Sequence, residues 1–255
     1  MPPPLPKAND FPTNLSPVIH LPANAKPTNA IIFLPGLGDN ARNFSSFAQA
    51  LNLPDALAIT LNPPFPLPLP LGLPGTQWSE DLHIDTSTGD LDLDSSPLTI
   101  AVKLVADDVI TKTLIDKFKY RPDQIHLFGF GQGGSVAIAV PLHASLATIS
   151  SSLGGVISIG GGLPLSMSPA GSASDGKVRT PLLLLSGSKS PLAAVGSSPL
   201  KRINDAYEFV EYHRWKKSDD SMPKNRDEVL PMMQFWARRL RSRRGVPDDA
   251  VELTG

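Results

Sequence analysis

The chain has 255 residues, of which 41% are hydrophobic, so it can bury one large core or two small ones. Charged residues make up 18% and the net charge is −1, which does not mark a nucleic-acid-binding protein. The absence of cysteine excludes disulfides, thiolate metal sites and a cysteine nucleophile. The N-terminus lacks a signal-peptide pattern and no apolar run approaches eighteen residues, so we expect a cytoplasmic protein without a transmembrane segment.

Short apolar runs alternate with amphipathic segments along the chain. The predicted strands cover residues 17–22, 30–34, 55–61, 124–130, 155–161, 181–187 and 209–215. The first predicted helix follows a cap at Asp39 or Asn40, and the second covers 95–118 with Ser96 as its cap. A third begins at 133 and runs through His143. The last two cover 199–209 and 226–242. This alternation predicts an α/β protein with a doubly wound, mostly parallel sheet and helices on both faces.

The chain divides by composition into three parts. Residues 1–15 are predicted to be a proline-rich flexible arm, 16–244 a single α/β domain, and 245–255 an acidic tail. Within the domain, the Pro-Leu loop 63–74 must adopt extended or polyproline II backbone and could line an apolar pocket, pack on the surface or bind a partner. The basic helix end 238–244 could be a solvated helix terminus or a contact with an anionic surface.

A glycine-rich turn, "HLFGFGQGGS", occupies residues 126–135 between a predicted strand and a predicted helix. It could be a dinucleotide-binding turn, a plain tight turn, or the Gly-x-Ser-x-Gly nucleophile elbow of α/β-hydrolases with Gly131 in the serine position. The dinucleotide reading is weak because the turn lies mid-chain and no acidic residue ends the following strand.

The order of several motifs favours the elbow. They are "LPGLGDN" (34–40), "GTQWSEDL" (75–82), "GFGQGG" (129–134), "SIGGGLPL" (158–165) and "TPLLLLSGSKSPL" (180–192). With these motifs the chain resembles the acyl-protein thioesterase branch of the α/β-hydrolases, the phospholipase/carboxylesterase family. The resemblance implies an α/β-hydrolase fold and an activity toward carboxylic esters or thioesters.

The resemblance also implies a Ser, Asp, His triad, in this chain order. All three positions differ here. Gly131 stands at the nucleophile and Ser190 at the acid. Counting forward from the last strand places the base near Asp220, and counting back from the last helix places it at Met222, which we take as the base position. We therefore expect a catalytically degenerate protein.

Other groups of the implied site do not depend on these side chains. The resemblance assigns the oxyanion hole to the backbone N–H groups of Leu37 and Gln132, which need no particular side chain. The candidate pocket residues are Gly36, Trp78, Ser79 and His83. The remaining histidines, His20, His126, His143 and His213, are interpreted as structural.

Three functions stay open at this point. The protein could bind a ligand, such as an acyl chain or small ester, or a protein partner in or near the old cleft. It could be an active ester or thioester hydrolase that uses Ser79, His83 or the Asp219–Asp220 pair, although a solvated loop is the simpler interpretation of that pair. It could also be an interaction protein with a vestigial cleft. We expect no metal site, because no His, Asp and Glu cluster has metal-ligand spacing. We also expect no cofactor and, given the net charge of −1, no nucleic-acid partner.

Overall fold

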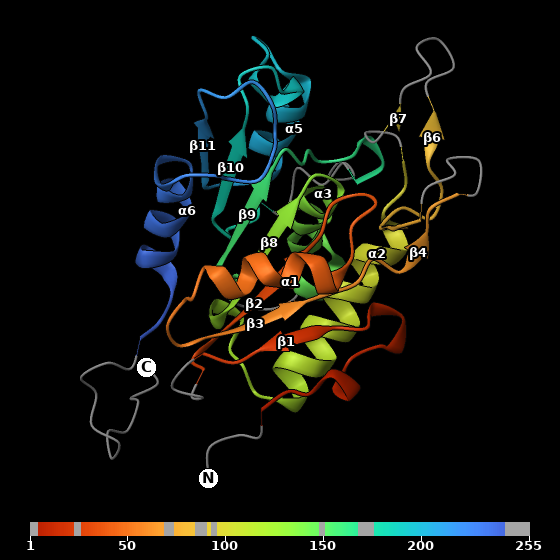
Figure 1. Ribbon diagram of the computed structural model, residues 1–255, viewed down its shortest axis with the longest axis vertical. Coiled ribbons are helices and arrows are strands. Elements are labelled where there is room, and N and C mark those ends of the chain that lie inside the picture. The colour runs from red at the N-terminus through yellow and green to blue at the C-terminus, as the bar shows by residue number, and fades with distance from the viewer. Residues whose placement is uncertain are drawn as a thin grey trace.

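The domain is built on one large twisted sheet (Figure 1). The computed structural model describes residues 5–22, 27–68, 74–84, 91–92, 96–147, 151–167 and 176–242. Within them, seven strands pair in the order β1-β3-β2-β8-β9-β10-β11. Their bounds are Val18–His20 (β1), Asn29–Leu34 (β2), Ala56–Thr60 (β3), Ile125–Phe130 (β8), Gly155–Ile159 (β9), Leu182–Ser186 (β10) and Val210–Arg214 (β11). Only β1 among these runs antiparallel to its neighbour, so the predicted mostly parallel sheet is confirmed.

Helices cover both faces of this sheet (Figure 1). One face packs against α1 (Ala41–Ala50) and α6 (Arg226–Arg239). The opposite face packs against α2 (Thr99–Lys103), its π-helical continuation η4 (Leu104–Lys117), α3 (Gln132–Ala139), α4 (Ala144–Ala147) and α5 (Ser198–Ala206). This is the α/β-hydrolase architecture that the resemblance implies.

Several short elements connect these layers. The 3-10 helices are η1 (Ala8–Asp10), η2 (Thr13–Leu15), η5 (Pro122–Gln124), η6 (Val140–Leu142), η7 (Leu165–Met167) and η8 (Pro191–Ala193). Two small antiparallel pairs join β4 (Phe65–Pro66) to β5 (Thr76–Gln77) and β6 (His83–Ile84) to β7 (Leu91–Asp92). The first pair lies in and beside the Pro-Leu loop, of which residues 69–73 are outside the described part.

The central strands bury both of their faces, as their apolar runs predict, whereas the edge strands β1 and β11 stay partly exposed. Along β2, Ala30, Ile32 and Leu34 face the α3 side, whereas Ile31 and Phe33 face the α1 side. On the α1 side, Phe128 forms the centre of an aromatic cluster. Its ring lies 5.3 to 6.1 Å from the rings of Phe33, Phe44, Phe47 and Trp236. Tilted rings at such distances are favourable beyond the area that they bury.

Three helix predictions need correction. The helix predicted from Ser96 begins at Thr99 after Leu98, and the N–H of Ile100 donates to the Glu80 carboxylate, so a distant side chain replaces the predicted cap. The helix predicted to continue from residue 133 is interrupted at Pro141, where the chain forms η6, because proline lacks the N–H that a helix needs. His143 therefore lies between η6 and α4, not inside a helix.

The last predicted helix is also shorter than expected. It ends at Arg239, where the N–H of Leu240 bonds to the Trp236 carbonyl and Leu240 turns to extended backbone.

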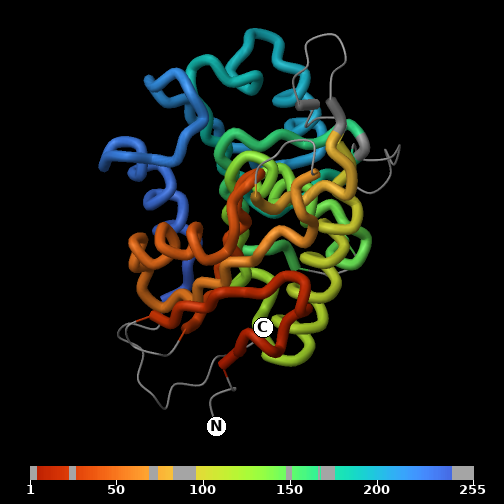
Figure 2. The backbone as a smooth tube through the Cα atoms, turned by 45° about the vertical axis from the view of Figure 1, so that its right-hand side comes forward, coloured from red at the N-terminus to blue at the C-terminus, as the bar shows by residue number. Residues whose placement is uncertain are grey.

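The segment predicted as a flexible arm packs on the domain over residues 5–15. Figure 2 shows this segment running beside the long helix that contains η4. Phe11 and Leu15 are buried in the core, and Asp10 forms an ion pair with Lys117 at 2.6 Å. The two apolar side chains hold the segment on the domain, because burying each large side chain stabilises the fold by about 1.5–3 kcal/mol.

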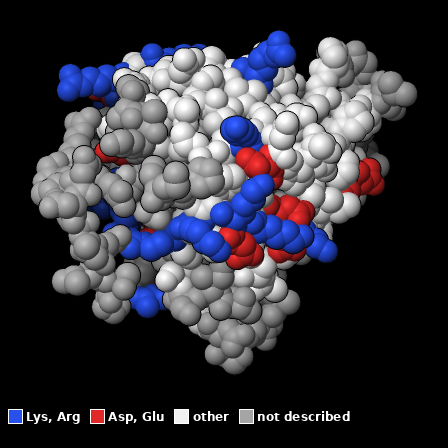
Figure 3. All heavy atoms as spheres, turned by 90° about the horizontal axis from the view of Figure 1, so that it is seen from below, with Lys and Arg blue, Asp and Glu red and all other residues white. Residues whose placement is uncertain are grey.

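The basic helix end is matched by acidic side chains. Arg238 and Arg239 pair with Glu211, and Arg241 pairs with Asp123. Figure 3 shows basic and acidic side chains intermixed on the lower face of the molecule, as in a solvated helix end. The remainder of the basic run and the acidic tail 245–255 lie outside the described residues.

Candidate functional site

The glycine turn has the backbone of an elbow. Gly131 links β8 to α3 with φ 51° and ψ −120°, a conformation that only glycine adopts without strain. Its N–H donates to the carbonyl of Ile159 at the end of β9, at 2.8 Å. A Cβ built on Gly131 would meet no atom within 4 Å, so the apex of the turn faces open space.

The two flanking glycines are fixed by close packing. A Cβ on Gly129 would lie 2.2 Å from the carbonyl oxygen of Gly133. A Cβ on Gly133 would lie 2.2 Å from the carbonyl oxygens of both Leu34 and Pro35. These glycines let β8, α3 and the end of β2 come together, which is the packing that the elbow requires.

The two predicted oxyanion donors lie on segments that Trp78 joins. The backbone N–H of Trp78 donates to the side-chain oxygen of Gln132 at 2.7 Å, and its indole N–H donates to the Pro35 carbonyl at 2.8 Å. Gln132 is the first residue of α3, whose N–H has no acceptor within the helix. Leu37 lies in the turn that follows β2. Trp78 is therefore a buried brace between these segments and not a cleft-lining side chain.

The predicted acid and base positions lie on two adjacent segments at the carboxyl ends of β10 and β11. The loop of residues 215–225 connects β11 to α6 and pairs with the segment after β10. The N–H of Ser188 donates to the Lys217 carbonyl at 2.8 Å, and the N–H of Lys189 donates to the Ser218 carbonyl at 3.0 Å. Ser190 is buried, and its hydroxyl accepts a hydrogen bond from the Leu192 N–H at the start of η8. Its role in the structure is therefore that of a cap.

The side chain in the 215–225 loop that reaches the strand ends is Asp220. Its Oδ1 accepts a hydrogen bond from the Gly187 N–H at 2.7 Å. Gly160, with φ +66°, makes room for it, because a Cβ on Gly160 would lie 2.7 Å from Cβ of Asp220. Ile159, the residue before Gly160, accepts the hydrogen bond from Gly131. The elbow apex and Asp220 therefore lie on either side of the end of β9.

Met222 is placed differently. It packs against the apolar cluster on the α1 and α6 face of the sheet. Of the two counts made from the sequence, the forward one thus gives the residue at the strand ends. The backward count differs because it assumes a fixed spacing to α6.

A lysine that the sequence analysis did not single out braces this loop. The Lys217 ammonium donates to the carbonyls of Ser221 at 2.5 Å and Met222 at 3.2 Å and to the Glu228 carboxylate at 3.0 Å. It also lies 3.9 Å from the centre of the Trp215 ring. No sequence motif marks this arrangement, because its acceptors are mostly backbone oxygens.

Asp219 faces outward in the same loop. Its carboxylate accepts hydrogen bonds from the Ser221 hydroxyl and N–H, and these hold the pKa of Asp219 below its ordinary value. The Asp219–Asp220 pair predicted as one alternative therefore has two different environments.

The remaining pocket candidates are not arranged as a cleft wall. Gly36 is buried, and a Cβ there would lie 2.8 Å from the Phe130 ring. Ser79 is fully buried, and its hydroxyl bonds within its own turn to the carbonyl and N–H of Asp81. His83 lies in β6, but its side chain is outside the described part of the structure.

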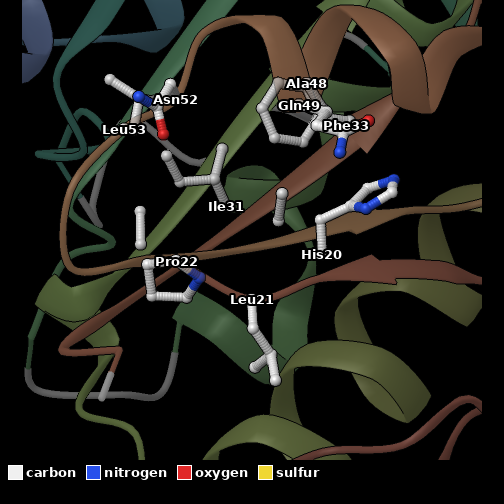
Figure 4. A pocket seen from close by; sticks show the side chains of 11 residues that line it. His20, Leu21, Pro22, Ile31, Phe33, Ala48, Gln49, Asn52 and Leu53 are labelled. Carbon is white, nitrogen blue, oxygen red and sulfur yellow. The ribbon is translucent and has the colours of Figure 1, made fainter. Parts of the chain in front are cut away.

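A cavity of about 220 Å³ lies elsewhere, between α1 and the edge of the sheet (Figure 4). Residues from β1, β2, β3 and α1 line it, including His20, Phe33 and Gln49. None of the elbow, Ser190 or Asp220 contributes to its wall. Within the described ranges, no group of three or more His, Asp and Glu side chains could hold a metal ion, and no helix is long and apolar enough to cross a membrane.

Comparison with known proteins shows the family of this chain. The phospholipase/carboxylesterase family matches residues 16–234. The chain belongs to this family. One relative is an uncharacterized hydrolase of Schizosaccharomyces pombe, 27% identical over 92% of this chain and 96% of its own length. Another is an uncharacterized hydrolase of Mycosarcoma maydis, 30% identical over 85% of this chain and 78% of its own length. Acyl-protein thioesterase 1 of Mycosarcoma maydis is 31% identical over 49% of this chain and 55% of its own length.

Solved structures show the same fold. Esterase PE8 covers 89% of this chain and 99% of its own with a TM-score of 0.69 and 19% identity. The structure of Zea mays acyl-protein thioesterase 2 matches 88% of this chain and 99% of its own, with a TM-score of 0.64 and 19% identity. The family is thus one of carboxylesterase- and thioesterase-like hydrolases, and the fold of this chain is theirs.

Proposed function

We propose that this protein binds a carbonyl compound, such as an acyl ligand, at the elbow and does not hydrolyse it. The proposal places the ligand carbonyl oxygen near the backbone N–H groups of Leu37 and Gln132, above Gly131. Family hydrolysis of esters or thioesters requires a nucleophile at that apex, and glycine has no side chain to attack with.

The observation on which the proposal rests is the combination found at Gly131. The backbone keeps the strained elbow conformation, which costs about 1–3 kcal/mol for a residue with a side chain, while the space above it is open. An elbow that served packing alone would need close contacts at its apex, as Gly129 and Gly133 have.

The acid and base positions support the same conclusion. Ser190 caps η8 and has no carboxylate to orient a histidine. Asp220 and Met222 both lack an imidazole, and Asp220 is bonded to the Gly187 N–H. In serine hydrolases the loss of triad members lowers turnover by about 10⁴- to 10⁶-fold, which is about 5–8 kcal/mol of barrier.

A fluorophosphonate probe for serine hydrolases tests the missing activity directly. The purified full chain should stay unlabelled, and its turnover of short acyl esters and thioesters should equal the buffer background. Labelling or turnover that disappears on Ser79→Ala, or turnover that disappears on Asp220→Asn, would overturn the proposal in favour of a rearranged hydrolase.

Binding is tested separately by NMR with methyl hexanoate as the probe. The amide signals of Leu37, Gly131 and Gln132 should shift together and saturate with a single affinity. A titration that moves none of these signals would overturn the binding half of the proposal.

A restored triad tests the assignment of the positions. The variant Gly131→Ser, Ser190→Asp, Asp220→His should gain esterase turnover over the matched double variant that keeps Gly131. An aspartate at 190 can accept the same capping hydrogen bond as the serine, so the η8 start should survive. Equal turnover of the two variants would count against this assignment.

A further inference from the structure

Two kinds of polar group lie near the elbow, at the carboxyl ends of the strands. The predicted oxyanion donors, the N–H groups of Leu37 and Gln132, can only donate hydrogen bonds. A carboxylate, Asp220, lies across the end of β9 from Gly131, and an ionised carboxylate can only accept them. In the family resemblance this side of the site holds a histidine, which can do both.

We infer that the preferred ligand at the elbow is a carboxamide, whose carbonyl oxygen accepts from the oxyanion donors while its N–H donates to Asp220. This inference rests on the proposed function, because it assumes that a carbonyl group binds above Gly131. It goes further by assigning Asp220 as the residue that selects the ligand class.

Asp220 is held ready for such a contact. Its Oδ1 is used by the Gly187 N–H, and Gly160 packs against its Cβ. The structure gives Oδ2 no hydrogen-bond partner among the described residues, and the Asp220 residue is partly exposed. One oxygen therefore fixes the side chain and the other is available to a ligand.

The loop that contains Asp220 is also fixed before any ligand binds. The Lys217 ammonium bonds to the carbonyls of Ser221 and Met222 and to the Glu228 carboxylate. Gly187 packs closely against the Asp219 backbone, because a Cβ on Gly187 would lie 2.2 Å from the Asp219 carbonyl oxygen. A preorganised acceptor loses little entropy on binding, so the contact contributes more of its free energy to affinity.

The same arrangement disfavours related ligands. An ester has the carbonyl but no N–H, so the second oxygen of Asp220 would face a group that cannot donate to it. A carboxylate ligand would place a second negative charge beside Asp220, and like charges at such distances repel. We expect the order of affinity to be amide, then ester, then carboxylate.

The experiment compares hexanamide, methyl hexanoate and hexanoate on the full chain at one pH and salt concentration. Affinities come from NMR titration, and shifts of the Gly131, Gln132 and Gly187 amides locate each probe. Hexanamide should bind at least about 10-fold more tightly than methyl hexanoate. The variant Asp220→Asn should reduce that ratio to near 1 and should improve binding of hexanoate.

Asp219→Asn is the matched control. It removes one negative charge from the same loop but alters a carboxylate that faces Ser221. It should leave the amide-to-ester ratio unchanged, whereas a general effect of loop charge would change the ratio in both variants. Unfolding curves of Asp220→Asn establish that the loop variant is folded. Asp220→Glu gives a second test: it retains the charge but moves the acceptor, so the amide-to-ester ratio should fall.

The outcomes separate the two proposals. If methyl hexanoate and hexanamide bind at the elbow equally well, or if Asp220→Asn leaves their ratio unchanged, the carboxamide inference is wrong and the proposed function stands. If neither probe shifts the elbow amides of the wild-type chain, both proposals fail.

Discussion

The elbow and the 215–225 loop both lie at the carboxyl ends of the strands, but different interactions hold them. The elbow is shaped by backbone packing so close that a Cβ at Gly129 or Gly133 would overlap carbonyl oxygens. The loop is shaped by charged side chains, because Lys217 and Asp220 bond to backbone groups within it and beside it. Backbone packing does not depend on the residue at the apex, so the elbow can keep its shape with glycine at position 131.

This difference explains why the site can retain a binding geometry without its expected reactive groups. The carbonyl-binding N–H groups belong to the backbone, whereas the nucleophile, acid and base are side chains. A substitution at Gly131 or Ser190 changes chemistry without changing the path of the chain. A substitution of Lys217 or Asp220 also removes hydrogen bonds that hold the loop in place.

The largest effect is expected within the elbow, from alanine at neighbouring glycines. Gly133→Ala places a Cβ 2.2 Å from two carbonyl oxygens and should lower the free energy of unfolding by more than about 4 kcal/mol or prevent folding. Gly131→Ala meets no atom within 4 Å and should cost only the backbone strain, about 1–3 kcal/mol. Urea unfolding and soluble yield measure both. Equal damage from the two substitutions would show that the apex is also closed by packing.

The next largest effect is a pH dependence of stability, which arises at the opposite end of the strands from the elbow. His126 lies near the start of β8 and is fully buried, with no hydrogen-bond partner found for either ring nitrogen in the described part. Burial, assisted by the Arg239 guanidinium, lowers the pKa of His126 to about 4 from 6.5.

The sign of the effect follows from proton uptake. Between pH 6.5 and 4 the unfolded chain binds a proton at this histidine and the folded chain does not, so stability falls as the pH falls. The shift corresponds to about 3 kcal/mol over that range. Asp219 and Glu228 have pKa values below their ordinary ones, so the stability that they add is lost at lower pH, outside most of this window.

Urea unfolding at pH 7, 5.5 and 4.5 checks this expectation. His126→Leu should flatten the loss of stability over this range. His213→Gln, at an exposed position in β11, should leave the wild-type slope in place. If His126→Leu keeps the wild-type slope, another group titrates in this window.

The sequence predicted well those features that local patterns determine. All seven strands of the sheet follow from short apolar runs, and central strands such as β2, β9 and β10 are buried on both faces. The elbow followed from the spacing of Gly129, Gly131 and Gly133, because that spacing is itself the packing requirement.

Features that depend on distant contacts were missed or misplaced. The start of α2 moved from Ser96 to Thr99 because Glu80, twenty residues away from Ile100, supplies the acceptor. Residues 5–15 were expected to be flexible, but Phe11 and Leu15 reach the core. Counting forward and counting back along the chain gave Asp220 and Met222, and the sequence analysis took Met222, since it had no sign of the Lys217 contacts that hold the loop.

The smallest effect expected is at Lys217 itself. Lys217→Met retains a long apolar stem beside Trp215 but removes the ammonium that bonds to Ser221, Met222 and Glu228. We expect the free energy of unfolding to fall by about 2 kcal/mol, since hydrogen bonds to charged groups contribute about 1.5–3 kcal/mol.

The local consequence distinguishes the loop from the elbow. Because Asp220 accepts from the Gly187 N–H, a loosened loop should make the Gly187 amide exchange with solvent faster, while the Gly131 amide, bonded to Ile159, should keep its rate. Lys216→Met is the control, because Lys216 is exposed and precedes the bracing residue. Faster exchange at both amides would mean that the elbow depends on the loop after all. Exchange unchanged at both would mean that Asp220 holds its place without the lysine.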